Sequence, residues 1–142
     1  MQARVKWLDH MSFVGESGSG HSVVMDGSPE HGGRNLGVRP METVLIGLGG
    51  CSVFDVMMML KKGRQNVTNC EVALDAARVD AVPAVFEKIH MTYLVEGHNL
   101  SEKQVHRAVA LSVEKYCSVT KMLEGTVEIT YDVKIEPAHS AE

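Results

Sequence analysis

The stretch VLIGLGGCSVFDVMMML, residues 44–60, is apolar enough for a core helix, yet three glycines and a cysteine lie in its first half. Each glycine inside a helix costs about 1 kcal/mol relative to alanine. Pro40 and Glu42 precede the stretch and suit a first helical turn, while the basic pair at 61–62 and then Gly63 suit a helix end. The sequence therefore predicts a helix from Pro40 to about residue 61 or 62, stopped by Gly63. Its glycines must serve something other than helix stability.

The composition predicts one globular domain covering residues 1–142. Of the 142 residues, 44% are hydrophobic and 23% are charged, and the formal net charge is -4. This charge argues against nucleic acid and anionic membranes as partners. The N-terminal segment lacks the apolar core of a signal peptide, and the stretch at 44–60 is expected to be too short and too glycine-rich to cross a bilayer. We therefore expect a cytoplasmic protein whose three cysteines are reduced.

Alternating residues predict strands on both sides of the central helix, and a capping pattern predicts a second helix. Ser101 and Gln104 form a capping-box pair, and the helix should run to about Tyr116. The predicted strands cover residues 3–9, 11–14, 21–26, 67–80, 85–96 and 126–136, with a short helical turn at 118–125. Strands, a helix, two strands, a second helix and a final strand indicate an α+β fold.

Cys51 has a plain interpretation and a functional one. Free cysteine is among the most buried residue types, so Cys51 can be a small core side chain. Gly47 and Gly50 lie close to it on the helix, however, and leave a face without side chains. Such a face either lets another backbone approach closely or leaves room for a substrate.

The thiolate form of a cysteine is the nucleophile, and it is stabilised by a helix N-terminus or by a nearby cation. Cys51 lies about three turns into the helix, so the dipole helps it little and a reactive Cys51 needs a cation. Arg39 and then Arg34, in the preceding loop, are the candidates. Asp55 follows one turn later and would oppose the thiolate if its side chain points inward. Cys117 is expected at the end of the second helix, where the dipole raises a thiol pKa, so it suits a resolving role.

The other motifs predict no further site. Cys70 lies in an alternating strand and is expected to be structural. The segments GLGG and GESGSG lack the context of phosphate-binding loops, so they are expected to be packing and turn glycines. The seven histidines form no HExxH motif, and no Cys-x-x-Cys is present. We therefore expect neither a metal site nor a bound cofactor.

Two cysteine segments together resemble a known family. PMETVLIGLGGCS, followed much later by EKYCSVTKMLEG, is similar to the signature segments of the OsmC/Ohr family, and most of all to its YhfA-like branch. This family comprises osmotically inducible protein C and the organic hydroperoxide resistance proteins. Pro40 precedes Cys51 by 11 residues (51 − 40) and Cys117 follows it by 66 (117 − 51), as in the family pattern.

The resemblance implies an intertwined α+β homodimer of OsmC-like fold with its sites at the subunit interface. It implies a thiol-dependent peroxidase that reduces organic hydroperoxides in oxidative or osmotic stress, without a bound cofactor. Cys51 would be the peroxidatic thiol, oxidised to a sulfenic acid, and Cys117 the resolving thiol that forms a disulfide with it. A dithiol such as lipoamide would reduce that disulfide, and Arg39 and Glu42 would complete the catalytic set.

Two departures from the family pattern favour other functions. The family's glutamate directly follows the proline, where this chain has Met41, so Glu42 is displaced by one residue, or about 100° around a helix. Ser118 replaces the family's proline after the second cysteine. The alternatives are a non-catalytic dimeric module that binds an apolar small molecule at the interface, and a structural stress protein with buried cysteines.

Overall fold

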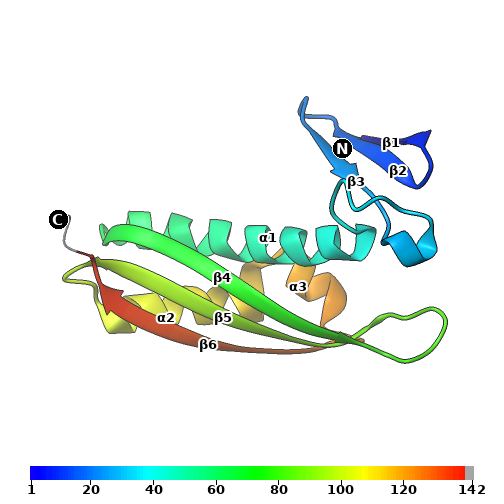
Figure 1. The fold of residues 1–142 in the computed structure, drawn as a ribbon. Coiled ribbons are helices and arrows are strands. Elements are labelled where there is room, and N and C mark those ends of the chain that lie inside the picture. Colours follow the sequence, from blue (N-terminus) through cyan, green and yellow to red (C-terminus); the bar gives the residue numbers. More distant parts are fainter. Residues whose placement is uncertain (140–142) are drawn as a thin grey trace. The chain divides into compact units, whose positions relative to one another are not determined.

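The computed structural model describes residues 1–139, and the chain divides into two compact units, residues 1–46 and the part that begins at Gly47. Each unit contributes one three-stranded sheet, and most of the helical residues belong to the second (Figure 1). The α+β class predicted from the sequence is confirmed.

The first unit is an antiparallel meander of short strands. Its sheet has the order β1–β2–β3, formed by β1 (Ala3–Asp9), β2 (Ser12–Ser17) and β3 (Ser22–Met25). All three predicted strands are present, although β2 extends beyond the predicted 11–14 because its pairing with β1 reaches Ser17. A 3₁₀ turn, η1 (Pro29–His31), follows and was not predicted.

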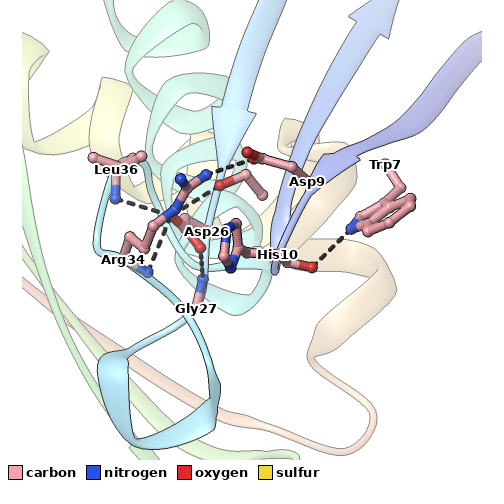
Figure 2. A network of polar contacts seen from close by, with 8 residues as sticks. Trp7, Asp9, His10, Asp26, Gly27, Arg34 and Leu36 are labelled. Atoms are coloured by element: carbon pink, nitrogen blue, oxygen red, sulfur yellow. Dashed lines mark hydrogen bonds and ion pairs between the residues drawn. The ribbon is translucent and has the colours of Figure 1, made fainter.

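Asp26 anchors the loop that follows β3. Its carboxylate accepts hydrogen bonds from the Ser12 hydroxyl at 3.0 Å and from the backbone N–H groups of Gly27, Arg34 and Leu36 at 2.7, 3.3 and 3.1 Å (Figure 2). Burial acts to raise the pKa of Asp26, but these hydrogen bonds outweigh it and hold the pKa below its usual value. The Asp26 side chain thus supplies hydrogen bonds that hold the loop at residues 27–36 in place.

The second unit places helices on a sheet of order β4–β5–β6. Its strands are β4 (Asn66–Arg78), β5 (Phe86–His98) and β6 (Glu128–Pro137). Its helices are α1 (Pro40–Lys62), which begins in the first unit, α2 (Glu102–Leu111), the π-helical turn η2 (Ser112–Tyr116) and α3 (Ser118–Leu123). The β4–β5 pair is antiparallel, whereas β5 and β6 are parallel. The segment α2–η2–α3 is the crossover that a parallel pair requires.

The core of this unit lies between one face of the sheet and the helices. Alternate residues of β5 are fully buried, and apolar residues of α1 and α2 complete the same core. These residues are Ile89, Met91, Tyr93 and Val95 of β5, Leu48, Val56 and Leu60 of α1, and Val105 and Val109 of α2. The opposite face of the sheet is polar and exposed, as His90 and Asp132 show by forming an ion pair there.

The glycines of α1 serve two different faces. A Cβ added to Gly49 would lie 2.9 Å from Leu74 Cδ1, so this glycine lets the helix approach β4. Added to Gly47 or Gly50, a Cβ would meet no heavy atom of the described residues within 4 Å. Phe54 lies beyond them on the exposed side and is 67% exposed. One glycine, Gly49, therefore serves the packing of α1 against the sheet, while the other two, Gly47 and Gly50, lie on its open face.

The length of α1 corrects one expectation. The helix has 23 residues, and an 18-residue window within it has a mean hydropathy of 1.8, with 28% of the window buried. By length and composition it can cross a membrane, so the expectation that the apolar stretch is too short is wrong on length. The glycines do not shorten it because Gly47, Gly49 and Gly50 all keep helical geometry.

Both predicted helix ends differ in detail. The α1 helix ends at Lys62, but the left-handed residue is Arg64, with φ of 56°, and not Gly63. A Cβ at Gly63 would lie 2.3 Å from Gln104 Oε1, so the flexible Gln104 side chain would have to move to accept one. The Ser101 hydroxyl accepts a hydrogen bond from the Gln104 N–H at 3.3 Å, as predicted.

The second half of the predicted capping box is different. Gln65 Oε1 accepts the Ser101 N–H at 2.8 Å, which places a side chain from the α1–β4 connection where the Gln104 side chain was expected. The regular helix then stops at Leu111 and continues to Tyr116 as the π-helical turn.

A buried hydroxyl cluster ties three elements together. Ser52 of α1 shares hydrogen bonds with the Tyr93 hydroxyl on β5 and with the Ser112 hydroxyl at 2.8 Å. Ser112 Oγ also lies 3.0 Å from the Ser52 carbonyl oxygen, to which it donates. Burial raises the pKa of Tyr93 to about 12, so the cluster stays neutral at physiological pH. The cluster fixes the rotation of α1 at the residue next to Cys51.

Asp26→Asn should lower stability most at neutral pH. Because the folded state lowers the pKa of Asp26, its contribution is present above the unfolded value near 3.8 and is lost as pH falls through the folded value. We expect the gap in melting temperature between wild type and variant to be largest at pH 7 and to shrink below about pH 4. Asp75→Asn, at an exposed position on β4, is the matched control. A gap that does not change with pH would contradict this account.

Ser52→Ala should cost more stability than Tyr93→Phe. The first change leaves the buried Tyr93 hydroxyl with only the weak Met91 sulfur contact at 3.9 Å, whereas the second leaves Ser52 paired with Ser112. We expect a loss of about 1–3 kcal/mol for Ser52→Ala and about 1 kcal/mol for Tyr93→Phe in urea unfolding. The reverse order would show that the tyrosine hydroxyl, and not the serine, organises the cluster.

Candidate functional site

The structure brings Cys51 and Cys117 together. Their Sγ atoms and a carboxylate oxygen of Asp55 all lie within 4.8 Å of one another. Cys51 and Asp55 come from successive turns of α1, and Cys117 lies between η2 and α3. Both cysteines are free thiols. Two thiols that are 66 residues apart in the chain thus share one site in the second unit.

Cys51 is the more accessible of the two thiols. Its side chain is half-buried, and the residue directly before it on α1, Gly50, is exposed. Cys117 is only 2% exposed, and its Sγ lies 4.0 Å from the Leu48 carbonyl oxygen. A reagent therefore reaches Cys51 more readily.

Burial raises the pKa of the Cys117 thiol, and the neighbouring Cys51 adds to the rise. The hydroxyl and backbone N–H of Thr120 oppose it. The raised pKa was expected, but its main cause is burial and not the end of a helix. Cys117 in fact ends η2 and begins α3, with its own N–H donating to the Ser112 carbonyl at 2.8 Å.

Asp55 points into the site. The sequence analysis expected this orientation to oppose a thiolate on Cys51. Its Oδ2 atom is buried and has no hydrogen-bond partner among residues 1–139. Two thiol sulfurs and one carboxylate oxygen therefore lie within 4.8 Å of one another at this site. The spacing of four residues in a helix is the sequence signal for this placement.

Thr120 is a site residue that the sequence analysis missed. It is 2% exposed, and its hydroxyl oxygen is buried without a hydrogen-bond partner of ordinary geometry among the described residues. It lies three residues after Cys117, on the first turn of α3, so its side chain is directed back toward the thiol. A hydroxyl residue three positions after a cysteine at a helix start is the signal that could have found it.

Arg39 and Glu42, the other expected site residues, lie in the first unit. The Arg39 guanidinium donates to the carbonyl oxygens of Asp26 and Gly37, at 3.4 and 3.2 Å. Its backbone N–H donates to Glu42 Oε1 at 2.7 Å, so Glu42 caps the start of α1. No ion pair joins the two side chains within residues 1–139. Their predicted role beside Cys51 stays a prediction.

Arg34, the second candidate cation, forms an ion pair with Asp9 on the surface of the first unit (Figure 2).

Cys70 is half-buried on β4, and burial, with Glu71 adding to it, raises its thiol pKa. These features make Cys70 a poor nucleophile, in keeping with the structural role expected for it.

The comparisons with known proteins place this geometry in one family. The family model described as OsmC-like protein matches residues 31–132. Protein YhfA of Escherichia coli K12 is 46% identical over 138 residues, which cover 97% of this chain and 100% of that protein.

Two solved structures extend the comparison. A hypothetical protein from Aquifex aeolicus VF5 superposes with a TM-score of 0.84 at 28% identity, covering 97% of both chains. The organic hydroperoxide resistance protein OhrB of Bacillus subtilis shares the fold, with a TM-score of 0.61 at 17% identity over 94% of this chain and 98% of that one. The family-model match and the relative at 46% identity show that the chain belongs to the OsmC-like protein family.

Proposed function

We propose that this protein is a thiol-dependent peroxidase that reduces organic hydroperoxides. The observation that carries the proposal is the meeting of Cys51 and Cys117 at one site. Membership in the OsmC family, whose structural relatives include organic hydroperoxide resistance proteins, supports a redox role in stress. The reduced thiols suit the cytoplasm, where we place the protein.

The proposed reaction begins at Cys51. Its thiolate attacks one peroxide oxygen, the O–O bond breaks, and the alkoxide takes a proton and leaves as an alcohol. Cys51 is then a sulfenic acid. The thiolate of Cys117 attacks the Cys51 sulfur, an S–S bond forms, and hydroxide leaves and is protonated to water. A dithiol such as dihydrolipoamide reduces the disulfide and is itself oxidised.

The two environments suit this order of events. The more exposed Cys51 meets the peroxide first, and the buried Cys117, with its raised pKa, is held back until an oxidised sulfur is beside it. The two Sγ atoms have to approach from within 4.8 Å to about 2.05 Å. The π-helical turn η2 and the short α3 on either side of Cys117 are the segments that can adjust.

Activation of Cys51 is assigned to Arg39, and Glu42 is proposed to orient it. The support is chemical: the guanidinium is a permanent cation, and here it donates only to neutral carbonyl oxygens, which leaves its charge uncompensated by the contacts described. A cation beside the thiolate offsets the repulsion from Asp55.

Purified protein should consume cumene hydroperoxide faster than hydrogen peroxide when dihydrolipoamide is supplied. Cys51→Ser should abolish turnover, because no other group forms the sulfenic acid. Cys117→Ser should stop after one oxidation and accumulate a sulfenic acid that dimedone labels on Cys51. Cys70→Ser, another half-buried cysteine, is the matched control and should keep full activity.

Absence of turnover in protein with all three thiols reduced would overturn the peroxidase proposal. It would favour the alternative, a non-catalytic module that binds an apolar small molecule. A mostly apolar hollow of about 480 Å³ on α1, lined by Gly50, Val53, Phe54, Met57, Met58 and Lys61, is the observation in favour of that alternative. Native mass spectrometry would then identify the bound molecule.

We propose that the protein is a homodimer that uses the exposed face of α1. This face carries Gly50, Phe54 and Met58, and the last two are 67% and 54% exposed. An apolar stripe of this kind on a 15.5 kDa chain is costly in water unless another surface covers it. The two open glycines allow a second backbone to approach closely.

Sedimentation equilibrium should give about twice the 15.5 kDa chain mass at micromolar concentration. Phe54→Asp should shift the protein toward the monomer, because it places a charge in the apolar contact. Met122→Asp is the control, at a methionine of α3 that is 77% exposed, and should leave the mass unchanged. A wild-type monomer would contradict the dimer, and an unchanged mass for Phe54→Asp would exclude this face.

A further inference from the structure

The thiol pair also has the donor atoms of a metal site. Cys51, Asp55 and Cys117 each offer one ligand atom, and these three atoms lie within 4.8 Å of one another. In a tetrahedral zinc site with Zn–S bonds of about 2.3 Å, two sulfur ligands are about 3.8 Å apart. Because the two sulfur atoms lie within 4.8 Å of each other, they need to approach by no more than about 1 Å to reach that spacing.

Among the described residues, two buried oxygen atoms on residues of this site lack hydrogen-bond partners. Asp55 Oδ2 and Thr120 Oγ1 are both buried and accept no hydrogen bond from the described residues. Thr120 is 98% buried, since its exposed fraction is 2%, and it lies beside the Cys117 thiol. An unpaired carboxylate oxygen away from water is costly, so this oxygen is suited to binding a cation.

The chemistry of the donor set selects the cation. Two cysteine sulfurs are soft ligands that favour zinc over magnesium or calcium, and one carboxylate oxygen completes a three-residue set. Three protein ligands leave the fourth position open, as in catalytic zinc sites. The Thr120 side chain lies beside the Cys117 thiol, and its unpaired hydroxyl is the kind of outer group that can orient a ligand.

We propose that Cys51, Asp55 and Cys117 bind one zinc-type divalent ion when both thiols are reduced. Each thiol releases a proton as its sulfur bonds to the ion, and no electrons are transferred. The sequence predicted no metal site because the two cysteines are not in a short motif. Their meeting depends on the crossover from β5 to β6, which brings Cys117 back to α1. The proposal does not depend on peroxidase activity.

The test uses the full-length protein, reduced with a phosphine and freed of metal by a chelator. Titration with zinc chloride in competition with a chromophoric chelator should give one bound ion per chain. Cobalt chloride should give a thiolate-to-cobalt charge-transfer band in the near ultraviolet. Cys51→Ser and Cys117→Ser should each remove most of that band, and Asp55→Asn should weaken zinc binding at least tenfold. Cys70→Ser should bind as the wild type does.

A second measurement keeps the proposal testable if a variant fails to fold by circular dichroism. In the wild type, saturating zinc should slow alkylation of the Cys51 peptide at least tenfold, as followed by mass spectrometry, and should leave the Cys70 peptide unchanged. No zinc binding by the reduced wild type would overturn the proposal. So would binding that persists without change in both cysteine variants, which would point to surface groups such as His90 and Asp132.

Discussion

The contact of α1 with β5 and η2 through the Ser52–Tyr93–Ser112 hydroxyl cluster is the constraint on which the site depends. All three hydroxyl residues are fully buried, so each oxygen has to be satisfied inside the protein. The cluster permits one rotation of α1, because a turn of the helix by one residue would move Ser52 about 100° away from Tyr93. That rotation also sets the direction of Cys51, the neighbouring residue, and of Asp55, one turn beyond it. The geometry of the candidate site is thus held by hydroxyl groups that lie next to it.

The glycines of the same helix allow the two faces of α1 to do different things. Gly49 brings the helix against Leu74 of β4, which tightens the buried side. Gly47 and Gly50 open the other side, next to the half-buried thiol of Cys51. The stability that these residues cost the helix is offset by burial of Leu48, Val56 and Leu60 against the sheet. Local propensity is overridden here because tertiary packing supplies more free energy than the helix loses.

The sequence predicted the order and approximate bounds of the main elements, because most of that information is local. Alternation identified β4, β5 and β6, and Pro40 with the lysine pair identified the ends of α1. It could not reveal the parallel pairing of β5 with β6, which depends on how the chain returns after α2. It could not reveal that Arg64, and not Gly63, adopts the left-handed conformation after α1, because glycine is the residue that this conformation usually favours.

The candidate site was predictable only in part, because the sequence reveals local patterns but not contacts between distant segments. The two cysteines were found through the spacing of their segments, and the helical period correctly placed Asp55 beside Cys51. The sequence did not identify Thr120 or the hydroxyl cluster, because serine and threonine are common residues whose burial no local pattern reveals. Burial, the main cause of the raised Cys117 pKa, is likewise a property of the folded chain and not of the segment around it.

The closeness of the two thiols bears on the order of steps in the proposed reaction. Cys117 is buried and lies beside Cys51, and both facts raise its pKa, so a negative charge on Cys51 opposes a second one on Cys117. Oxidation of Cys51 to a neutral sulfenic acid would remove that charge and make Cys117 easier to ionise just when it has to attack. A divalent ion would relieve the same repulsion in another way, by stabilising both thiolates and the Asp55 carboxylate together. Because a thiolate bound to the ion is no longer free to attack a peroxide, the two states exclude each other. The crowding of negative groups, which appears unfavourable for a single thiolate, therefore suits a site that changes state when its charge is neutralised.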